Sequence, residues 1–254
     1  MTIRTATLNG VATIEIARPE KKNAITQAMY RQMAEAIDAA VADPAVRAIL
    51  LTGQPGIFTS GNDVEDFMQR PSGDASESTA FAFMRALIEC DKPVIAAVTG
   101  AAIGIGTTML LHCDFVYVSD EARLAMPFVS LGLVPEFASS LVVPQLLGNV
   151  RAAEKLLLGE PFTGADAVEA GIANAVLPAT EVANHARRIA ERFNALPPGA
   201  VRETKKLMRR GRNAALFEVI DIERDVFAAR LRTPEAQEAF SAFFQKRKPD
   251  FSKF

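Results

Sequence analysis

The most constraining feature of this sequence is a glycine-rich stretch near the middle of the chain. A short run of β-branched and small apolar residues, Val94 to Val98, follows a proline and predicts a buried strand. Gly100, Gly104 and Gly106 come next, and they are followed by an apolar run with helical periodicity from Thr107 to Leu111. A strand, a tight turn and a helix start leave backbone N–H groups free at the positive end of a helix dipole. The sequence therefore predicts an anion-binding turn at this point.

The same glycines also match the TGxxxGxG loop of short-chain dehydrogenases, from Thr99 to Gly106. In that family the loop follows the first strand near the N-terminus, and a Tyr-x-x-x-Lys pair carries the proton chemistry. Here the loop begins at residue 99, and neither Tyr30 nor Tyr117 has a lysine four residues later. Because a glycine pattern without its structural context is weak evidence, we disfavour a dinucleotide site.

The order of the predicted elements indicates an α/β chain. Residues 3–16 predict two short strands joined by a tight Asn-Gly turn, and Thr26 to Val41 has the apolar spacing of a helix. Arg47 to Thr52 predicts a buried strand, whereas the polar stretch from Pro71 to Thr79 predicts a loop. Strands that alternate with helices in this way are typical of βαβ units and layered α/β folds.

The character of the chain changes near its C-terminal end. Three helical patterns follow one another without an intervening strand pattern, at Gly199–Arg210, Asn213–Leu231 and Thr233–Lys248. We therefore predict two regions, an α/β core over residues 1–196 and a helical C-terminal region over residues 197–254.

Composition and charge exclude several classes of protein. The 254-residue chain has a formal net charge of −2 and a pI near 5.8, which argues against a nucleic-acid partner. No apolar run approaches the ~18 residues of a membrane span, and the N-terminus lacks the apolar core of a signal peptide. Cys90 and Cys113 are too few for a disulfide framework or a zinc site, so we expect a cytoplasmic protein without a metal.

Several segments in order carry a resemblance to a known family. Arg18–Ala24 reads RPEKKNA, Phe58–Asp63 reads FTSGND, and Lys92–Asp114 begins with KPVIAAVTG and ends in Cys-Asp. Pro161–Ala173 contains a further matching segment, which ends in Gly-Ile-Ala. With these motifs the chain resembles the enoyl-CoA hydratase/isomerase (crotonase) family from end to end.

That resemblance implies a crotonase-like α/β fold of repeated ββα units, in which the helical C-terminal region makes trimer contacts. It also implies a homotrimer or a dimer of trimers that acts on an acyl-CoA thioester. No separate cofactor is expected, because coenzyme A is part of the substrate. Neither a nucleic acid nor a membrane is expected as a partner.

The resemblance further implies an oxyanion hole, in which two backbone N–H groups stabilise the thioester oxygen as it gains enolate character. By this resemblance one N–H comes from Ser60 and the other from Ile105. Further family positions that would contact the substrate or coenzyme A are Asn23, Ala24, Gly61, Asn62, Asp63, Gly104, Phe243 and Lys246. Phe243 and Lys246 would meet the adenine ring and the 3′-phosphate, by stacking and by charge attraction.

Carboxylates decide which reaction such an oxyanion hole supports. The hydratases of the family use two glutamates, and at those two positions this chain has Thr108 and Phe128. One acid remains nearby, Glu136, in a segment that resembles the LGxxPExxSS pattern of the peroxisomal-type Δ3,Δ2-enoyl-CoA isomerases. In those enzymes that glutamate is the base.

The surroundings of Glu136 predict opposing effects on its pKa. Apolar neighbours such as Leu133 and Phe137 would raise the pKa of the carboxyl group, whereas a helix starting at Pro135 would lower it. An alternative interpretation is that Glu136 is a first-turn glutamate that only complements a helix N-terminus.

Three functional hypotheses remain. The first is an enoyl-CoA isomerase that uses an oxyanion hole and Glu136 as its single base. The second is an enoyl-CoA hydratase with an atypical acid/base, and the third is an acyl-CoA-binding homologue without catalysis. We disfavour a peptidase of a related fold, because neither His112 nor His185 lies in a recognisable triad context.

Overall fold

A computed structural model describes residues 2–68 and 78–254 of the chain, so most of the loop predicted at Pro71–Thr79 lies outside the described residues. Two sheets form the centre of the molecule. The larger sheet has six strands in the order β1-β2-β3-β5-β7-β10, and the smaller has four in the order β4-β6-β8-β9. The strands of the larger sheet are β1 (Ile3–Leu8), β2 (Val11–Ile16), β3 (Ala48–Thr52), β5 (Val94–Val98), β7 (Phe115–Ser119) and β10 (Ala175–Leu177). Those of the smaller sheet are β4 (Ile57–Thr59), β6 (Ala101–Ile103), β8 (Arg123–Ala125) and β9 (Phe162–Thr163).

From β3 to β8, successive strands alternate between the two sheets. β3, β5 and β7 are parallel neighbours in the larger sheet, and the strand that follows each of them, β4, β6 or β8, joins the smaller sheet. This arrangement confirms the predicted α/β fold of repeated ββα units. It also shows that the glycine stretch is more than one turn, because strand β6 (Ala101–Ile103) separates Gly100 from Gly104.

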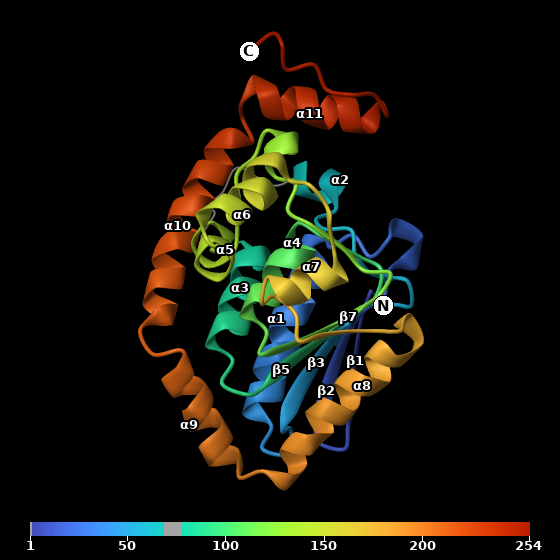
Figure 1. Cartoon of the computed structure of the whole chain (residues 1–254), viewed down its shortest axis with the longest axis vertical. Helices are drawn as coiled ribbons and strands as arrows, with labels where there is room; N and C mark the ends of the chain where they lie inside the picture. Colours follow the sequence, from blue (N-terminus) through green and yellow to red (C-terminus); the bar gives the residue numbers. More distant parts are fainter. Residues whose placement is uncertain (1, 69–77) are drawn as a thin grey trace.

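Helices cover the larger sheet on both faces (Figure 1). On one face lie α1 (Gln27–Ala42) and α3 (Thr79–Glu89), which contact each other and contribute to the main apolar core. Both helices begin where the sequence provides a cap, since the Thr26 and Ser78 hydroxyls accept hydrogen bonds from backbone N–H groups. On the other face α8 (Ala179–Glu191) packs against the apolar side chains of β2, β3 and β5.

Three helices follow the core, α9 (Pro198–Met208), α10 (Arg212–Arg230) and α11 (Pro234–Phe244). In Figure 1 α10 runs along one side of the molecule, and α11 crosses its end. α10 contacts α5 (Ser139–Leu147), and α11 contacts the short 3-10 helix at Val129–Leu131. The C-terminal helices therefore pack on the core segment between residues 129 and 147, which contains Glu136.

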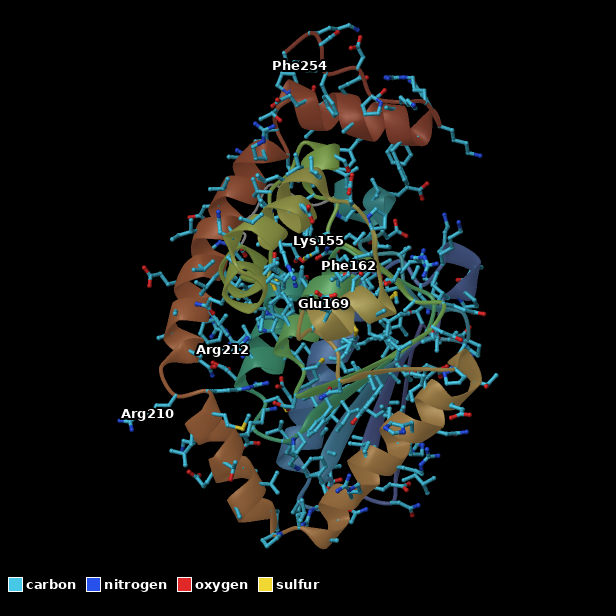
Figure 2. All side chains as sticks on the ribbon, viewed as in Figure 1. Lys155, Phe162, Glu169, Arg210, Arg212 and Phe254 are labelled. Atoms are coloured by element: carbon cyan, nitrogen blue, oxygen red, sulfur yellow. The ribbon has the colours of Figure 1, made fainter. Side chains whose placement is uncertain are left out.

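Part-buried ion pairs attach the C-terminal end of α9 to the core. The carboxylate of Asp114 accepts hydrogen bonds from Lys205 Nζ at 2.6 Å, from Arg209 Nη2 at 2.9 Å and from the backbone N–H of Val94 at 2.8 Å. In the next turn Arg212 donates to the carbonyl of Leu111 at 3.2 Å, whereas Arg210 points away from the core (Figure 2). The start of α10 is thus tied to the segment that follows the glycine stretch.

The remaining α-helices of the described residues are short and lie in the connections between strands. They are α2 (Val64–Met68), α4 (Ile105–Thr108), α6 (Asn149–Ala153) and α7 (Gly164–Glu169). Across residues 2–68 and 78–254, no helix is both long enough and apolar enough to cross a membrane.

We expect Gly100→Ala to lower the free energy of unfolding by roughly 3–5 kcal/mol, because it combines left-handed strain with a backbone clash. Gly100 has φ +65°, and a Cβ atom there would lie 1.9 Å from the carbonyl oxygen of Gly56. Gly211→Ala is the matched control: its φ is +77°, but a Cβ would meet nothing within 4 Å. The control should cost only about 1–2 kcal/mol. Urea unfolding checks both values, and equal losses in the two variants would refute the clash.

Candidate active site

Two neighbouring cavities lie where the loops of the smaller sheet meet the C-terminal helices. The larger has a volume of about 770 Å³, and the smaller, of about 90 Å³, contains Glu136 on its wall. Asn62 and Phe227 lie on the walls of both cavities, so they mark the junction. Of the sequence-predicted residues, the larger cavity brings together Ala24, Ser60, Gly61, Asn62, Asp63, Gly104, Ile105, Phe243 and Lys246.

Sheet topology places the two predicted oxyanion loops side by side. β4 and β6 are parallel neighbours, and the loop at residues 60–63 follows one strand while Gly104 follows the other. The approach is close enough to require glycine. A Cβ at Gly61, which has φ +95°, would lie 2.9 Å from Ile103 O, and one at Gly106 would lie 2.5 Å from Thr59 Cγ2.

The hydrogen bonds of these loops change the assignment of one oxyanion donor. The N–H of Ser60 donates to Lys22 O at 3.1 Å, and the N–H of Gly61 donates to Thr59 Oγ1 at 3.1 Å. The N–H groups of Asn62 and Ile105, by contrast, have no acceptor within the described parts of the chain. Our expectation for Ser60 is therefore wrong, because its N–H is already used. The available pair is Asn62 and Ile105.

Asn23 also differs from its predicted role. Its side chain is fully buried and donates to the carbonyls of Ile57 and Phe58 at 3.1 Å each, and its own carbonyl accepts the Thr59 hydroxyl at 2.7 Å. Asn23 therefore holds strand β4 in place and does not line the cavity, whereas its neighbour Ala24 does. The expected contact of Asn23 with coenzyme A is corrected to a structural role.

Two side chains stabilise the loop that presents Asn62. The Asp63 carboxylate forms an ion pair with Arg18 at 2.6 Å and accepts the N–H of Asp66 at 3.1 Å. Burial alone would raise the pKa of Asp63, but the hydrogen bond and the charge of Arg18 hold it below its usual value. The hydroxyl of Tyr30 donates to the Asn62 side-chain oxygen at 2.6 Å.

Glu136 is placed in apolar surroundings by three separate elements. The smaller cavity is lined by Phe81 and Met84 from α3 and by Ile220 from α10, and the Thr108 hydroxyl donates to Glu136 Oε1 at 2.5 Å. Burial raises the pKa of the Glu136 carboxyl to about 8. The charge of the nearby Glu223 carboxylate also raises this pKa, whereas the Thr108 hydrogen bond lowers it. Burial is therefore the main cause of the predicted upward shift.

No helix starts at Pro135, so two of our expectations for this segment are wrong. Helix α5 begins at Ser139, and before it Phe137 and Ala138 form a left-handed turn with φ of 59° and 56°. Glu136 therefore precedes the helix by three residues and is not a first-turn glutamate. The predicted lowering of its pKa by a helix dipole is absent for the same reason.

Sequence reasoning missed the partners of this glutamate. The motifs mark Thr108 only as the replacement of a hydratase acid, and they do not mark Tyr30 or Glu223 at all. Glu223, on α10, lies 87 positions after Glu136 in the sequence and faces the same cavity. No local pattern could have identified it, because only the packing of α10 on the core brings it there. Among the described residues there is also no His, Cys, Asp and Glu cluster that could hold a metal ion.

Residues of the C-terminal region also line the larger cavity. Phe240 and Phe243 of α11, together with Lys246 just beyond the end of that helix, lie on the cavity wall. Phe243 is 57% exposed, so its ring is accessible from solvent. An aromatic face beside a lysine is suited to a flat heterocycle that carries phosphate groups.

Comparison with known proteins gives three kinds of match. The enoyl-CoA hydratase/isomerase family profile matches residues 6–253. A solved structure, that of Pseudomonas aeruginosa OdaA, is 52% identical with a TM-score of 0.92, and the match covers 95% of this chain and 98% of that one. The Rattus norvegicus protein named enoyl-CoA delta isomerase 2 is 34% identical over 243 residues, which are 94% of this chain and 62% of that protein.

A further relative carries the name of a different reaction. The Escherichia coli (strain K12) protein named 2,3-dehydroadipyl-CoA hydratase is 29% identical over 241 residues, which are 95% of this chain and 94% of that protein. Similarity of sequence alone therefore points to both a hydratase and an isomerase. The choice between the two reactions therefore depends on the side chains of the site.

Proposed function

This chain belongs to the enoyl-CoA hydratase/isomerase family of acyl-CoA enzymes, and from that premise we propose that it is a Δ3,Δ2-enoyl-CoA isomerase. The observation that carries the proposal is the Glu136 carboxylate, held by Thr108 in an apolar cavity beside the oxyanion loops. Thr108 and Phe128 stand at the two positions where the resemblance places hydratase glutamates.

The proposed reaction is a double-bond shift through a dienolate. The N–H groups of Asn62 and Ile105 donate to the thioester oxygen, and each such donor is typically worth about 10²–10³ in rate. The Glu136 carboxylate takes a proton from C2 of a 3-enoyl-CoA, and negative charge moves to the thioester oxygen. The protonated Glu136 then returns the proton to C4, which leaves the double bond between C2 and C3.

The environment of Glu136 supports this role. A general base is most effective when its pKa lies near the working pH, and burial raises the pKa of Glu136 to about 8. A carboxylate with an ordinary pKa would be a much weaker base toward a carbon acid. The apolar wall of the smaller cavity also keeps water away from the dienolate.

Hydration would need a second group to deliver a proton. Among the described residues, the other carboxylate on the wall of the smaller cavity is Glu223, but both of its oxygens accept hydrogen bonds from the backbone and side chain of the Ala138–Ser140 segment. A carboxylate held in this way is poorly placed to exchange protons with a substrate. We therefore favour isomerisation over hydration.

Binding of the substrate's coenzyme A is proposed for the larger cavity. Ala24, Gly61 and Gly104 lie on its wall, and Phe243 and Lys246 lie on the part contributed by the C-terminal region. The Phe243 ring would stack on the adenine and Lys246 would attract the 3′-phosphate. The role of the 197–254 region in a homotrimer or dimer of trimers remains a proposal that light scattering of the purified protein would test.

A paired assay tests the proposed function. Purified protein is given 3-enoyl-CoA and 2-enoyl-CoA of several chain lengths, and double-bond shift and water addition are followed separately. Isomerisation without hydration is the expected result. Hydration at a comparable rate would contradict it and favour the atypical hydratase, and binding without either reaction would favour an acyl-CoA-binding homologue.

The pH dependence should follow the ionisation of Glu136. Because the carboxylate is the active form, kcat/KM should fall about tenfold per pH unit below an apparent pKa near 8 and level off above it. Thr108→Val removes the hydroxyl that stabilises the carboxylate, so the midpoint should move to higher pH. The rate at pH 7 should then fall about three- to tenfold.

Thr108→Ser is the matched control for this prediction, because serine keeps the hydroxyl donor. Its pH midpoint should stay near that of the parent protein. An unchanged midpoint in Thr108→Val would show that the hydrogen bond does not tune Glu136. Initial rates across a pH series on 3-enoyl-CoA provide the measurement.

A further inference from the structure

The segment that carries Glu136 has a conformation that its own residues disfavour. Phe137 and Ala138 adopt left-handed backbone angles in succession, with φ of 59° and 56°. Residues with a Cβ atom rarely take this conformation, and two in a row persist only where surrounding contacts hold them. The direction of the Glu136 side chain depends on this turn, because it follows Glu136 immediately.

The turn is held from α10 by a buried carboxylate. Glu223 Oε2 accepts the N–H of Ala138 at 2.6 Å, and Glu223 Oε1 accepts the N–H of Ser140 at 3.0 Å and its hydroxyl at 2.5 Å. Glu223 is only 6% exposed. Hydrogen bonds to an ionised group in such surroundings are stronger than neutral ones, and here they also satisfy the first free N–H groups of α5.

A second side chain contacts the same turn. His112 stacks on the Phe137 ring with centroids 4.1 Å apart, and its Nε2 lies 2.8 Å from Phe137 O. Because a carbonyl oxygen only accepts, Nε2 carries the hydrogen and donates it. Burial lowers the pKa of His112 to about 3, so the ring is neutral when it makes this contact.

We propose that Glu223 is a positioning residue for Glu136: it holds the Phe137–Ala138 turn and thereby aims the Glu136 carboxylate into the cavity. The inference rests on the proposed function insofar as Glu136 is the base. Because Glu223 lies on α10, the C-terminal helical region would then contribute to the site.

Glu223 also affects Glu136 through charge. Among the described residues, the ionisable groups on the wall of the smaller cavity are Tyr30, Glu136, Glu223 and Arg224, and Arg224 is ion-paired with Asp221 at 2.5 Å. The negative charge of Glu223 raises the pKa of Glu136, after the larger effect of burial. Removing that charge should therefore lower the pKa of Glu136 and move the acid limb of the rate to lower pH.

The test compares Glu223→Gln with Glu218→Gln in the full-length protein. At position 223 glutamine keeps the shape of the side chain and one acceptor oxygen, but its NH₂ group faces an N–H or hydroxyl donor of the Ala138–Ser140 segment. Glu218 is the control, because it is an exposed residue of the same helix. For Glu223→Gln we expect kcat to fall about 10²-fold with KM within about threefold, and the pH midpoint to move down. Glu218→Gln should leave all three values unchanged.

A smaller change guards against loss of folding. Ser140→Ala removes only the hydroxyl donated to Glu223, at an exposed position, and should lower kcat by less than Glu223→Gln does. A purely structural Glu223 would lower the melting temperature while kcat, KM and the pH midpoint of the folded protein stayed at parent values. That result would overturn the proposal.

Carbon-13 NMR of the glutamate carboxyl groups provides a readout without turnover. The Glu136 signal is assigned by its loss in Glu136→Gln, and its titration midpoint should be lower in Glu223→Gln than in the parent protein. If Glu136→Gln isomerises at the parent rate, the proposed function fails, and the NMR midpoint alone decides on Glu223. An unchanged midpoint would then overturn the inference, and a lowered one would support it.

Discussion

Glu136→Gln should lower kcat for isomerisation of 3-enoyl-CoA by about 10³-fold or more, since one general base carries both proton transfers. KM should stay within about threefold, because glutamine has the same shape and the Thr108 hydroxyl can still donate to its side-chain oxygen. Steady-state kinetics, together with calorimetric binding of a saturated acyl-CoA, separates the loss of catalysis from any loss of binding.

The matched control is Glu160→Gln, the same substitution at an exposed position. It should keep the kcat of the parent protein. If Glu136→Gln isomerises as fast as this control, Glu136 is not the base and the proposed mechanism is wrong.

We also make an independent prediction about the stability of Glu136→Gln. Glu136 has a pKa raised from 4.5 to about 8 in the folded protein, so folding favours its protonated form. Its contribution to stability is complete below pH 4.5 and is lost as the pH rises through 8. Glutamine cannot ionise, so the melting temperature of Glu136→Gln relative to the parent protein should increase over this range. A constant difference would mean that Glu136 titrates normally.

Ile105→Pro should lower kcat by about 10²–10³-fold, the usual effect of removing one oxyanion donor. Proline lacks the backbone N–H, and the N–H of Ile105 has no acceptor within the described residues, so no internal hydrogen bond is lost. Ile105 is also the first residue of α4, a position where proline is favoured. The substitution therefore removes the proposed donor with little disturbance of the backbone.

Ile105→Ala is the control, because Ile105 is fully buried and alanine removes most of its side chain but keeps the backbone N–H. The alanine variant should lose about 2–5 kcal/mol of stability but keep kcat at a temperature where it is folded. Equal kcat values in the proline and alanine variants would rule out Ile105 as an oxyanion donor. Both variants are measured at saturating 3-enoyl-CoA, with thermal melting to establish the folded range.

Local sequence patterns were sufficient for the core elements. The Val94–Val98 strand has the predicted bounds, and the Asn9-Gly10 pair joins the first two strands with φ values of 49° and 71°. Such features depend on neighbours in sequence, either through side-chain alternation or through turn chemistry. The short strand β6 could not be predicted in this way, since three residues between glycines are too few to show a periodicity.

Sequence motifs could not predict which backbone N–H groups of the proposed oxyanion loops are free. The motif at Phe58–Asp63 indicated the loop that follows β4, but it could not say which N–H was free. Ser60 is excluded only because Lys22, 38 residues earlier, places its carbonyl 3.1 Å from that N–H. Likewise, the Asn23 side chain does not line the cavity, because it donates hydrogen bonds to the carbonyls of Ile57 and Phe58 in β4.

By itself the sequence determined the family, the α/β order of elements and the identity of the one candidate base, because these depend on residue types and their spacing along the chain. Only the tertiary structure decided which backbone donors are available and how basic Glu136 is. Those properties depend on hydrogen-bond partners and on exclusion of water, and the groups responsible, Thr108, Glu223 and the apolar side chains of α3 and α10, are brought to Glu136 by packing.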